Sequence, residues 1–205
     1  MKLVIATRNK KKLKELQEIL GDDLNLDIFS LDSFPEVGEI EETGKTFREN
    51  AILKASAVAS LTGCLALADD SGLCVDFLNG SPGVFSARFA GNEADDKANN
   101  EQLLSLLDGI ALERRTGRFV CNIAVADSRG MIDVVEGSIE GLIIDELRGS
   151  NGFGYDPLFF IPEHNKTFAE LGPEIKNRIS HRFQALGQAK KLLSEHLQKT
   201  ERSAQ

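Results

Sequence analysis

The hydrophobic pattern at the start of the chain predicts a strand, a helix and a second strand. Residues 3–6 form a short apolar run, and leucine and isoleucine then recur at helical spacing over residues 13–20. A second apolar run at residues 26–31 predicts the next strand, and residues 47–63 predict a long helix that ends at Gly63. This order is typical of a βαβ-like opening.

The later pattern extends the sheet. Residues 64–78 are apolar on both sides of an acidic turn that contains glycine, which predicts either two strands or one bent strand. Residues 118–127 and 131–141 predict an antiparallel pair, and residues 180–197 predict a closing helix. We therefore expect an α/β fold with a long, mixed, twisted sheet flanked by helices. We expect one domain over residues 1–197, and a polar tail over residues 198–205 that frays.

Composition narrows the class of protein. The chain has 205 residues, 41% of them hydrophobic, and a formal net charge of −8, which argues against a nucleic-acid binder because such a protein needs a dominant basic face. The first apolar run is too short for a signal peptide and no later run could span a bilayer, so we expect a cytoplasmic protein without a membrane partner. Cys64, Cys74 and Cys121 lack the spacing of a metal or redox motif and are expected to be buried free thiols.

The first predicted helix begins with an unusual charge pattern. Lys10, Lys11 and Lys12 crowd its first turn, where the helix dipole favours Asp or Glu. This arrangement predicts that the turn meets an anion.

Two acidic segments suggest a metal site. Residues 38–46 end like a phosphate-binding P-loop, but five residues separate Gly38 from Gly44 where that loop requires four, and three glutamates would repel phosphate. This segment is either a solvated acidic turn or a loop in which one glutamate binds a hard cation. Asp69 and Asp70 directly follow an apolar run, so they form either an Asx-type turn bent at Gly72 or the second half of an Mg²⁺ site.

Two further segments offer groups that could bind a nucleotide. Residues 148–162 combine glycines with aromatic residues, which suits either an ordinary loop over core aromatics or a slot for a nucleobase. Residues 174–186 cluster Lys176, His181 and Arg182, which alone would suggest a solvated face. Together with Lys12 and Lys54, these cations could meet a triphosphate and a base from several sides.

The ordered motifs "IATRNKKK", "EETGKTFRENAILKA", "LADDSGLCVDFLNGSPGVFSARFAG", "GFGYDPLF" and "ISHR" resemble those of the inosine/xanthosine triphosphate pyrophosphatases, also called non-standard purine nucleoside triphosphate pyrophosphatases. The resemblance covers nearly the whole chain. It implies an elongated α/β fold with two lobes, a central cleft that binds a purine triphosphate with Mg²⁺, and a homodimer. The implied reaction is hydrolysis between the α and β phosphates of inosine, deoxyinosine or xanthosine triphosphate, which releases the monophosphate and pyrophosphate.

The resemblance also implies roles for individual residues. Asp70 matches the proton acceptor, and Glu41 and Asp70 match the metal ligands, although Glu42 is an alternative to its neighbour because only one of two adjacent side chains can face the cleft in an extended segment. Arg8 stands where many members have Gly or Ser. The positions that match substrate contacts, or lie among them, are Thr7, Arg8, Asn9, Lys12, Lys54, Ser71, Phe153, Gly154, Tyr155, Asp156, Lys176, His181 and Arg182.

Two other functions remain open at this point. A Maf-like pyrophosphatase for other modified nucleotides would share a related fold, but the "GFGYDP" and "ISHR" segments argue against it. A protein that senses a purine nucleotide without hydrolysing it is disfavoured, because a pure binder would not need a water-activating carboxylate beside its metal.

Overall fold

The computed structural model describes residues 1–20, 26–92 and 95–203, and the chain divides into two compact units. The first unit consists of Met1–Asp70, Cys121–Gly137 and Arg182–Gln205, and the second consists of Ser71–Val120 and Ser138–His181. Each unit is therefore assembled from stretches that are far apart in the sequence.

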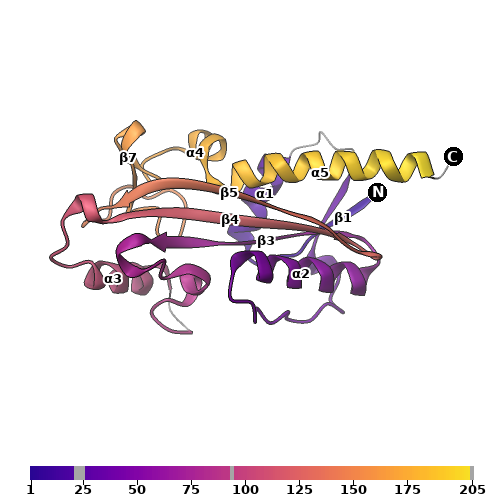
Figure 1. Ribbon diagram of the computed structural model, residues 1–205, viewed down its shortest axis with the longest axis horizontal. Helices are drawn as coiled ribbons and strands as arrows, with labels where there is room; N and C mark the ends of the chain where they lie inside the picture. The colour runs from indigo at the N-terminus through magenta and orange to yellow at the C-terminus, as the bar shows by residue number, and fades with distance from the viewer. Residues whose placement is uncertain (21–25, 93–94, 204–205) are drawn as a thin grey trace. The chain divides into compact units, whose positions relative to one another are not determined.

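The first unit opens with the predicted strand, helix and strand. β1 (Lys2–Ile5), α1 (Lys10–Leu20) and β2 (Asp27–Ser30) follow one another, and β1 pairs with β2 in parallel. The long helix α2 (Phe47–Thr62) then leads to β3 (Leu65–Val75), which pairs with the other edge of β1, again in parallel. The chain thus crosses to one side of β1 and then back to the other (Figure 1).

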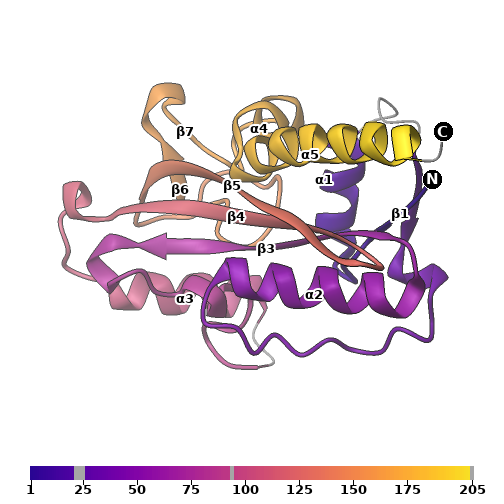
Figure 2. The same cartoon turned by 45° about the vertical axis from the view of Figure 1, so that its right-hand side comes forward.

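Two crossovers that run in opposite directions place their helices on opposite faces of a sheet when both are right-handed, as parallel crossovers nearly always are. The buried residues follow this rule. Leu3 and Ile5 of β1 pack in one cluster with α1 and with the last helix, α5 (His181–Ser203), whereas Val4 and Ala6 pack in another cluster with α2. Figures 1 and 2 show α5 and α2 on opposite sides of the strands.

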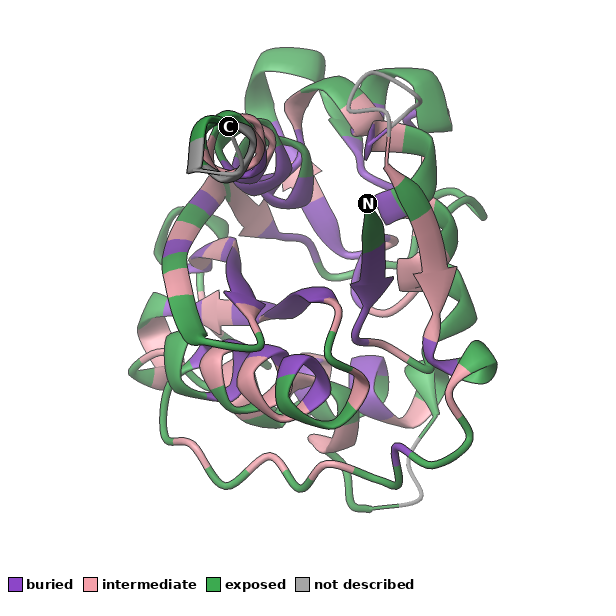
Figure 3. Cartoon of the chain, turned by 90° about the vertical axis from the view of Figure 1, so that its right-hand side faces the viewer, coloured by how far each residue is buried: buried purple, intermediate pink, exposed green. Residues whose placement is uncertain are grey.

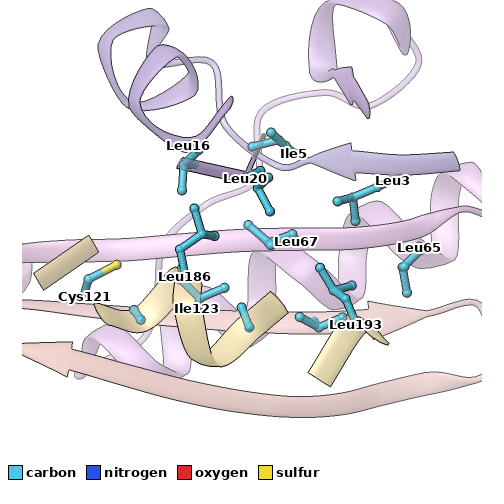
Figure 4. Packing of buried hydrophobic residues seen from close by; sticks show 13 residues of the cluster. Leu3, Ile5, Leu16, Leu20, Leu65, Leu67, Cys121, Ile123, Leu186 and Leu193 are labelled. Atoms are coloured by element: carbon cyan, nitrogen blue, oxygen red, sulfur yellow. The ribbon is translucent and has the colours of Figure 1, made fainter. Parts of the chain in front are cut away.

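The cluster between α1, α5 and the strands is built from aliphatic side chains. Figure 4 shows Leu16 and Leu20 of α1 and Leu186 of α5 beside Leu67 of β3. In Figure 3, β1 beside the N label is exposed at Lys2 and buried over the rest of its length. Strand residues therefore alternate between two apolar faces, which explains why these short strands are continuous hydrophobic runs.

Two long strands carry the chain through both units. β4 (Thr116–Asp127) and β5 (Gly130–Ile143) are neighbours in the sheet, and the two-residue turn between them makes the pair antiparallel, as predicted. Within residues 64–78, Leu65–Val75 form one strand, β3, rather than two. The sequence pattern left both possibilities open because the acidic residues interrupt the apolar run.

The second unit contains elements that the hydrophobic pattern did not predict. These are α3 (Asp96–Leu106), β6 (Phe159–Ile161), β7 (Lys166–Thr167) and α4 (Pro173–Ile179). Short 3-10 helices lie at Leu31–Ser33 in the first unit and at Asp76–Leu78, Gly83–Arg88, Leu112–Arg114 and Pro162–His164 in the second. The order of the hydrogen-bonded strands is β2-β1-β3-β4-β5-β6-β7, and β6 is antiparallel to both of its neighbours, β5 and β7.

The core of the second unit is aromatic. Phe119, Phe159 and Phe168 contact one another with ring centroids 4.6 to 5.8 Å apart. Leu103 of α3 and Leu73 of β3 belong to the same buried cluster. Large flat side chains thus fill a unit whose strands and helices are short.

The ends of the helices agree with their sequence signals. Thr46 caps α2 by accepting a hydrogen bond from the Glu49 N–H at 3.1 Å, and Gly63 ends the helix in the left-handed conformation at φ 66°. Helix α5 continues to Ser203, past the point where the tail was expected to begin. Fraying of residues 198–205 stays a prediction, and residues 204 and 205 lie outside the described part of the chain.

The α/β class and the mixed sheet are confirmed, whereas the cleft stays a prediction. None of the helices in the described ranges is both long enough and apolar enough to cross a bilayer.

Candidate active site

The first candidate cluster lies at the carboxyl end of β1, in the first unit. β1 is paired with β2 on one side and β3 on the other, and in open α/β sheets such a reversal of strand order is where ligands bind. Ile5, the last residue of β1, pairs with Leu67 of β3. Asp69 and Asp70 therefore come two and three residues beyond this pair, beside the loop that leaves β1.

That loop caps α1 with its own side chain. The Asn9 Oδ1 accepts hydrogen bonds from the N–H groups of Lys11 and Lys12 at 3.0 and 3.1 Å, and the Thr7 Oγ1 accepts one from the Asn9 N–H at 3.2 Å. Two of the backbone N–H groups in this turn, where the sequence predicts an anion, thus already have a partner. The positive charge that the helix start offers comes mainly from lysine side chains.

Asp69 is enclosed by cations. Its Oδ2 lies 3.2 Å from the Lys12 Nζ and 3.6 Å from the Arg182 Nε, and its side chain is 0% exposed. Burial alone would raise the pKa of this carboxyl, but Lys12, Arg182 and Lys54 outweigh burial and hold the pKa far below its ordinary value. Asp69 is therefore a permanent anion in the folded chain.

Asp70 has the opposite environment. Burial raises its pKa above the ordinary value, Glu42 raises it further, and the opposing effects of Lys54 and Lys12 do not cancel these two. The Asn50 Nδ2 donates a hydrogen bond to the Asp70 Oδ2 at 3.0 Å. Adjacent carboxyls whose pKa values are pushed apart suit different tasks, one as a fixed charge and the other as a proton acceptor.

Lys54 joins Asp70 to the acidic loop. Its Nζ lies 2.6 Å from the Glu42 Oε1 and 3.6 Å from the Asp70 Oδ1. Burial lowers the pKa of Lys54, but the three carboxylates Asp69, Asp70 and Glu42 outweigh burial and raise it. Lys54 therefore stays charged and bridges two carboxylates.

The carboxylate that faces Asp70 is Glu42, whereas Glu41 is exposed. The loop is held in this register by Gly44, whose N–H donates to the Asn50 Oδ1 at 2.8 Å. A Cβ at Gly44 would lie 2.6 Å from that oxygen, so a larger residue would displace the loop. The geometry thus favours Glu42 of the two neighbours, and the assignment of Glu41 stays a prediction.

The carboxylates of the first cluster fit a hard cation that also binds phosphate oxygens of a substrate. Two carboxylates, Glu42 and Asp70, already share the ammonium of Lys54 as a cation. Across the described ranges, no three His, Cys, Asp or Glu side chains group closely enough to hold a metal alone. Mg²⁺ typically takes one or two carboxylates and completes its shell with water and phosphate oxygens, so two are sufficient.

The second candidate cluster lies in the second unit, on the glycine-rich loop. The Lys176 Nζ donates to the Asp156 Oδ2 at 2.7 Å, and both side chains are buried. The same ammonium lies 5.0 Å from the centroid of the Phe153 ring. His181 stacks on Phe119, with centroids 4.9 Å apart and ring planes 12° from parallel. The ion pair and the cation–π contact thus hold this loop against α4, whereas His181 packs on the aromatic core.

Comparison with known proteins gives the family. The model of the Ham1 family matches residues 3–192 of the chain. The chain belongs to the Ham1 family.

Relatives and solved structures agree with this assignment. The dITP/XTP pyrophosphatase of Desulforamulus reducens is 57% identical over 95% of this chain and 96% of its own length, and that of Geobacter sulfurreducens is 52% identical over 96% of each. The structure of a HAM1 protein from Coxiella burnetii superposes with a TM-score of 0.87 at 45% identity, covering 95% of this chain and 99% of the other.

The site residues predicted for a Ham1 chain divide between the two units. The first unit holds Thr7, Arg8, Asn9, Lys12, Glu41, Lys54, Asp70 and Arg182, and the second holds Ser71, Phe153, Gly154, Tyr155, Asp156, Lys176 and His181.

Within the first unit, Lys12, Lys54 and Arg182 surround the Asp69–Asp70 pair. Arg8 does not contact this pair of carboxylates in the structure: it is exposed and donates a hydrogen bond to the Val37 carbonyl.

Several predicted contact residues of the Ham1 chain have structural partners of their own. The Tyr155 hydroxyl donates to the Ser86 carbonyl at 2.8 Å. The Phe153 N–H donates to the Asp156 Oδ2 and the Gly154 N–H donates to the Asp96 Oδ2, each at 2.9 Å. The backbone N–H groups of Phe153 and Gly154, in the loop that could form a nucleobase slot, are thus already in use.

Sequence reasoning missed Asn50. This residue is 1% exposed on the face of α2 that faces the core, and it links the acidic loop to Asp70. The available signal was a polar residue at a core position of an otherwise apolar helical pattern. Glu15, which pairs with Arg182, gave no such signal because a glutamate on an amphipathic helix is ordinary.

Proposed function

We propose that the chain hydrolyses non-standard purine nucleoside triphosphates, namely inosine, deoxyinosine and xanthosine triphosphate, to the monophosphate and pyrophosphate. The observation that carries this proposal is the contrast between Asp69, a fixed anion among cations, and Asp70, a carboxyl of raised pKa beside Glu42, with Lys12 and Lys54 at hand. The names of the relatives support the same reaction and substrate class.

In this proposal, the first unit binds the triphosphate and activates water. Lys12 and Lys54 compensate the charge of the phosphates and of the leaving pyrophosphate. Asp70 orients the attacking water and accepts its proton. The residues that would meet the purine stay a prediction from the family motifs.

We propose Mg²⁺ as the cofactor, held by Asp70 and Glu42 in preference to Glu41. When bound, Mg²⁺ would neutralise phosphate charge and orient the phosphates. The contribution of the chain itself is a carboxylate pair already held around a cation, with the Asn50 amide fixing the position of Asp70.

Base choice rests on the group at position 6 of the purine, which is an acceptor in inosine and a donor in adenosine. If the site aims hydrogen-bond donors at position 6, adenine would place its own donor against them and leave them unpaired. Such a mismatch discriminates strongly against adenosine triphosphate. Of the expected donors, Arg182 is 2% exposed and ion-paired with Glu15, and His181 is stacked on Phe119. Their role in reading the base, the homodimer and the cytoplasmic location stay predictions.

The test is pyrophosphate release from inosine, xanthosine, guanosine and adenosine triphosphates at matched concentrations, with and without Mg²⁺. Release that depends on Mg²⁺ and is confined to the first two supports the proposal. Binding of inosine triphosphate without cleavage would favour the sensor, and cleavage of modified pyrimidine nucleotides alone would favour the Maf-like alternative.

Asp70→Asn tests the proton acceptor directly. Removal of a positioned base should lower kcat by about 10²- to 10⁴-fold with a smaller effect on substrate binding. Asp108→Asn, a neutralised carboxylate at an exposed position, is the control and should keep full activity. An Asp70→Asn variant with kcat near that of the control would remove Asp70 from the mechanism.

A further inference from the structure

The proposed reaction gives Asp69 no task beyond that of a fixed negative charge, yet it is the most enclosed carboxylate of the first candidate cluster. Its side chain is 0% exposed, against 8% for Asp70 and 30% for Glu42. A buried charge is costly unless its surroundings compensate it, so a residue of this kind needs a reason that fold stability alone does not give.

Its contacts form a chain of charges that begins and ends on α1. Lys12 of α1 contacts Asp69 of β3, Asp69 contacts Arg182 at the start of α5, and Arg182 contacts Glu15, which is again on α1. Lys12 and Glu15 are three residues apart and therefore lie on the same side of the helix. This arrangement fixes the position of the Lys12 side chain relative to β3.

Asp69 is poorly placed to be a metal ligand itself. The charged groups that affect it most are the cations Lys12, Arg182 and Lys54, and these would repel a divalent ion. Asp70 differs because Glu42 is among its neighbours. The two adjacent carboxylates thus have different partners, and the natural partner of Asp69 is an ammonium.

Fixing Lys12 matters because lysine is a flexible point charge. Its ammonium sits on a four-carbon stem with many rotamers, whereas charge stabilisation in a transition state requires a cation that is already in place. The Lys12 side chain is still 17% exposed, so one side of it can meet an anion while Asp69 holds it.

We propose that Asp69 is a positioning residue that acts through Lys12, holding its ammonium where negative charge develops on the phosphates. This inference rests on the proposed function, because it needs a phosphate-transferring reaction at the first cluster. It assigns Asp69 no contact with substrate or metal.

The experiment is a double-mutant cycle of Asp69→Asn and Lys12→Met, read as kcat and KM for pyrophosphate release from inosine triphosphate with Mg²⁺. Misplacing a catalytic group by 1 Å can cost about 10²-fold, so Asp69→Asn should lower kcat about 10- to 100-fold in the wild-type background. In the Lys12→Met background, where no ammonium remains to be positioned, it should change kcat by less than about threefold.

Asp27→Asn, a neutralised carboxylate at an exposed position of β2, is the matched control in both backgrounds and should change neither kcat nor KM. Asp69→Glu keeps the charge but moves it, and it replaces Asp69→Asn in the cycle if the latter does not fold. Thermal melts of every variant establish that each one is folded under the assay conditions.

The results separate three possibilities. Effects of Asp69→Asn and Lys12→Met that multiply would overturn the inference, because Asp69 would then act independently of Lys12, for example by supporting the fold. An effect that persists in the Lys12→Met background but disappears in Arg182→Met would also overturn it. If the wild-type chain releases no pyrophosphate from any of the purine triphosphates, the proposed function fails, and the inference fails with it.

Discussion

The ion pair between Lys176 and Asp156 gives a prediction about stability that does not depend on any ligand. The Lys176 Nζ lies 2.7 Å from the Asp156 Oδ2, and the two residues are 5% and 2% exposed. Asp156→Asn keeps the shape of the side chain and an acceptor for the Phe153 N–H, but it removes the charge that faces the ammonium. We expect the second unit to be destabilised.

The size of the effect follows from the geometry. At 2.7 Å and an effective dielectric constant of about 20, the attraction between unit charges is about 6 kcal/mol, and desolvation offsets much of it. Removing one partner of such a buried pair typically costs about 3 to 5 kcal/mol. The rings of Phe153 and Phe168, 5.0 and 5.6 Å from the ammonium, continue to attract the cation. We therefore expect the lower value, a loss of about 3 kcal/mol in the free energy of unfolding.

The chain provides its own probe for this measurement. It contains one tyrosine and no tryptophan, so intrinsic fluorescence reports only Tyr155, the neighbour of Asp156 in the second unit. Urea unfolding followed by this fluorescence, with far-UV circular dichroism for the whole chain, yields the free energy of unfolding. With a typical slope of about 2 kcal/mol per molar urea, the fluorescence midpoint should fall by about 1.5 M.

Asp145→Asn, at an exposed position, is the control and should leave the midpoint unchanged. A cycle with Lys176→Met completes the test, because the loss caused by Asp156→Asn should be largely absent when the ammonium is gone. A shift in midpoint below about 0.5 M, or losses that simply add, would show that the charges do not stabilise one another and would refute this reasoning.

Two further predictions concern backbone geometry and titration. Gly152→Ala should destabilise the chain strongly, because Gly152 has φ +78° and a Cβ there would lie 2.0 Å from the Asp156 Oδ2, whereas Gly38→Ala, with no atom within 4 Å, should be close to neutral in a thermal melt. Burial and the nearby Asp69 raise the pKa of the Cys121 thiol from 9.0 to about 12, so the folded chain holds this proton more tightly than the unfolded chain does. The contribution of the protonated Cys121 thiol to the free energy of unfolding is therefore complete below pH 9 and is lost as the pH rises from 9 towards 12. Urea titrations between these pH values should show a smaller fall in the free energy of unfolding for Cys121→Ala than for the wild-type chain.

The sequence predicted most of the first unit because its elements have strong local signals. Apolar runs, helical spacing, the Thr46 cap and Gly63 all act within a few residues. The elements that it missed have weak signals. Helix α3 (Asp96–Leu106) is mostly polar, with Leu103 as its fully buried apolar residue, and β6 and β7 are three and two residues long. Their positions are set by the aromatic core of the second unit rather than by local propensity.

The sequence predicted which residues belong to the first candidate cluster, but not which of them contact one another. Motif order brought out Asp70, Lys12 and Lys54, which the structure places in one cluster. The choice between Glu41 and Glu42 depended on the register of an extended loop, which the Gly44–Asn50 hydrogen bond fixes. Spacing along the chain carries no information about such a contact, because it joins a loop to the buried face of a helix.

The first unit draws its site from both ends of the chain. Arg182 reaches Glu15 across 167 residues of sequence, and Leu186 and Leu193 of α5 complete the core against α1 and β3. Contacts of such high sequence separation form late, because the loop that they close must lose its entropy before the contacts stabilise it. A ribosome that has translated only as far as His181 has therefore made the lysines and carboxylates of the first candidate cluster but not Arg182 or the rest of α5. The first candidate cluster should therefore be complete only once α5 (His181–Ser203) has left the exit tunnel.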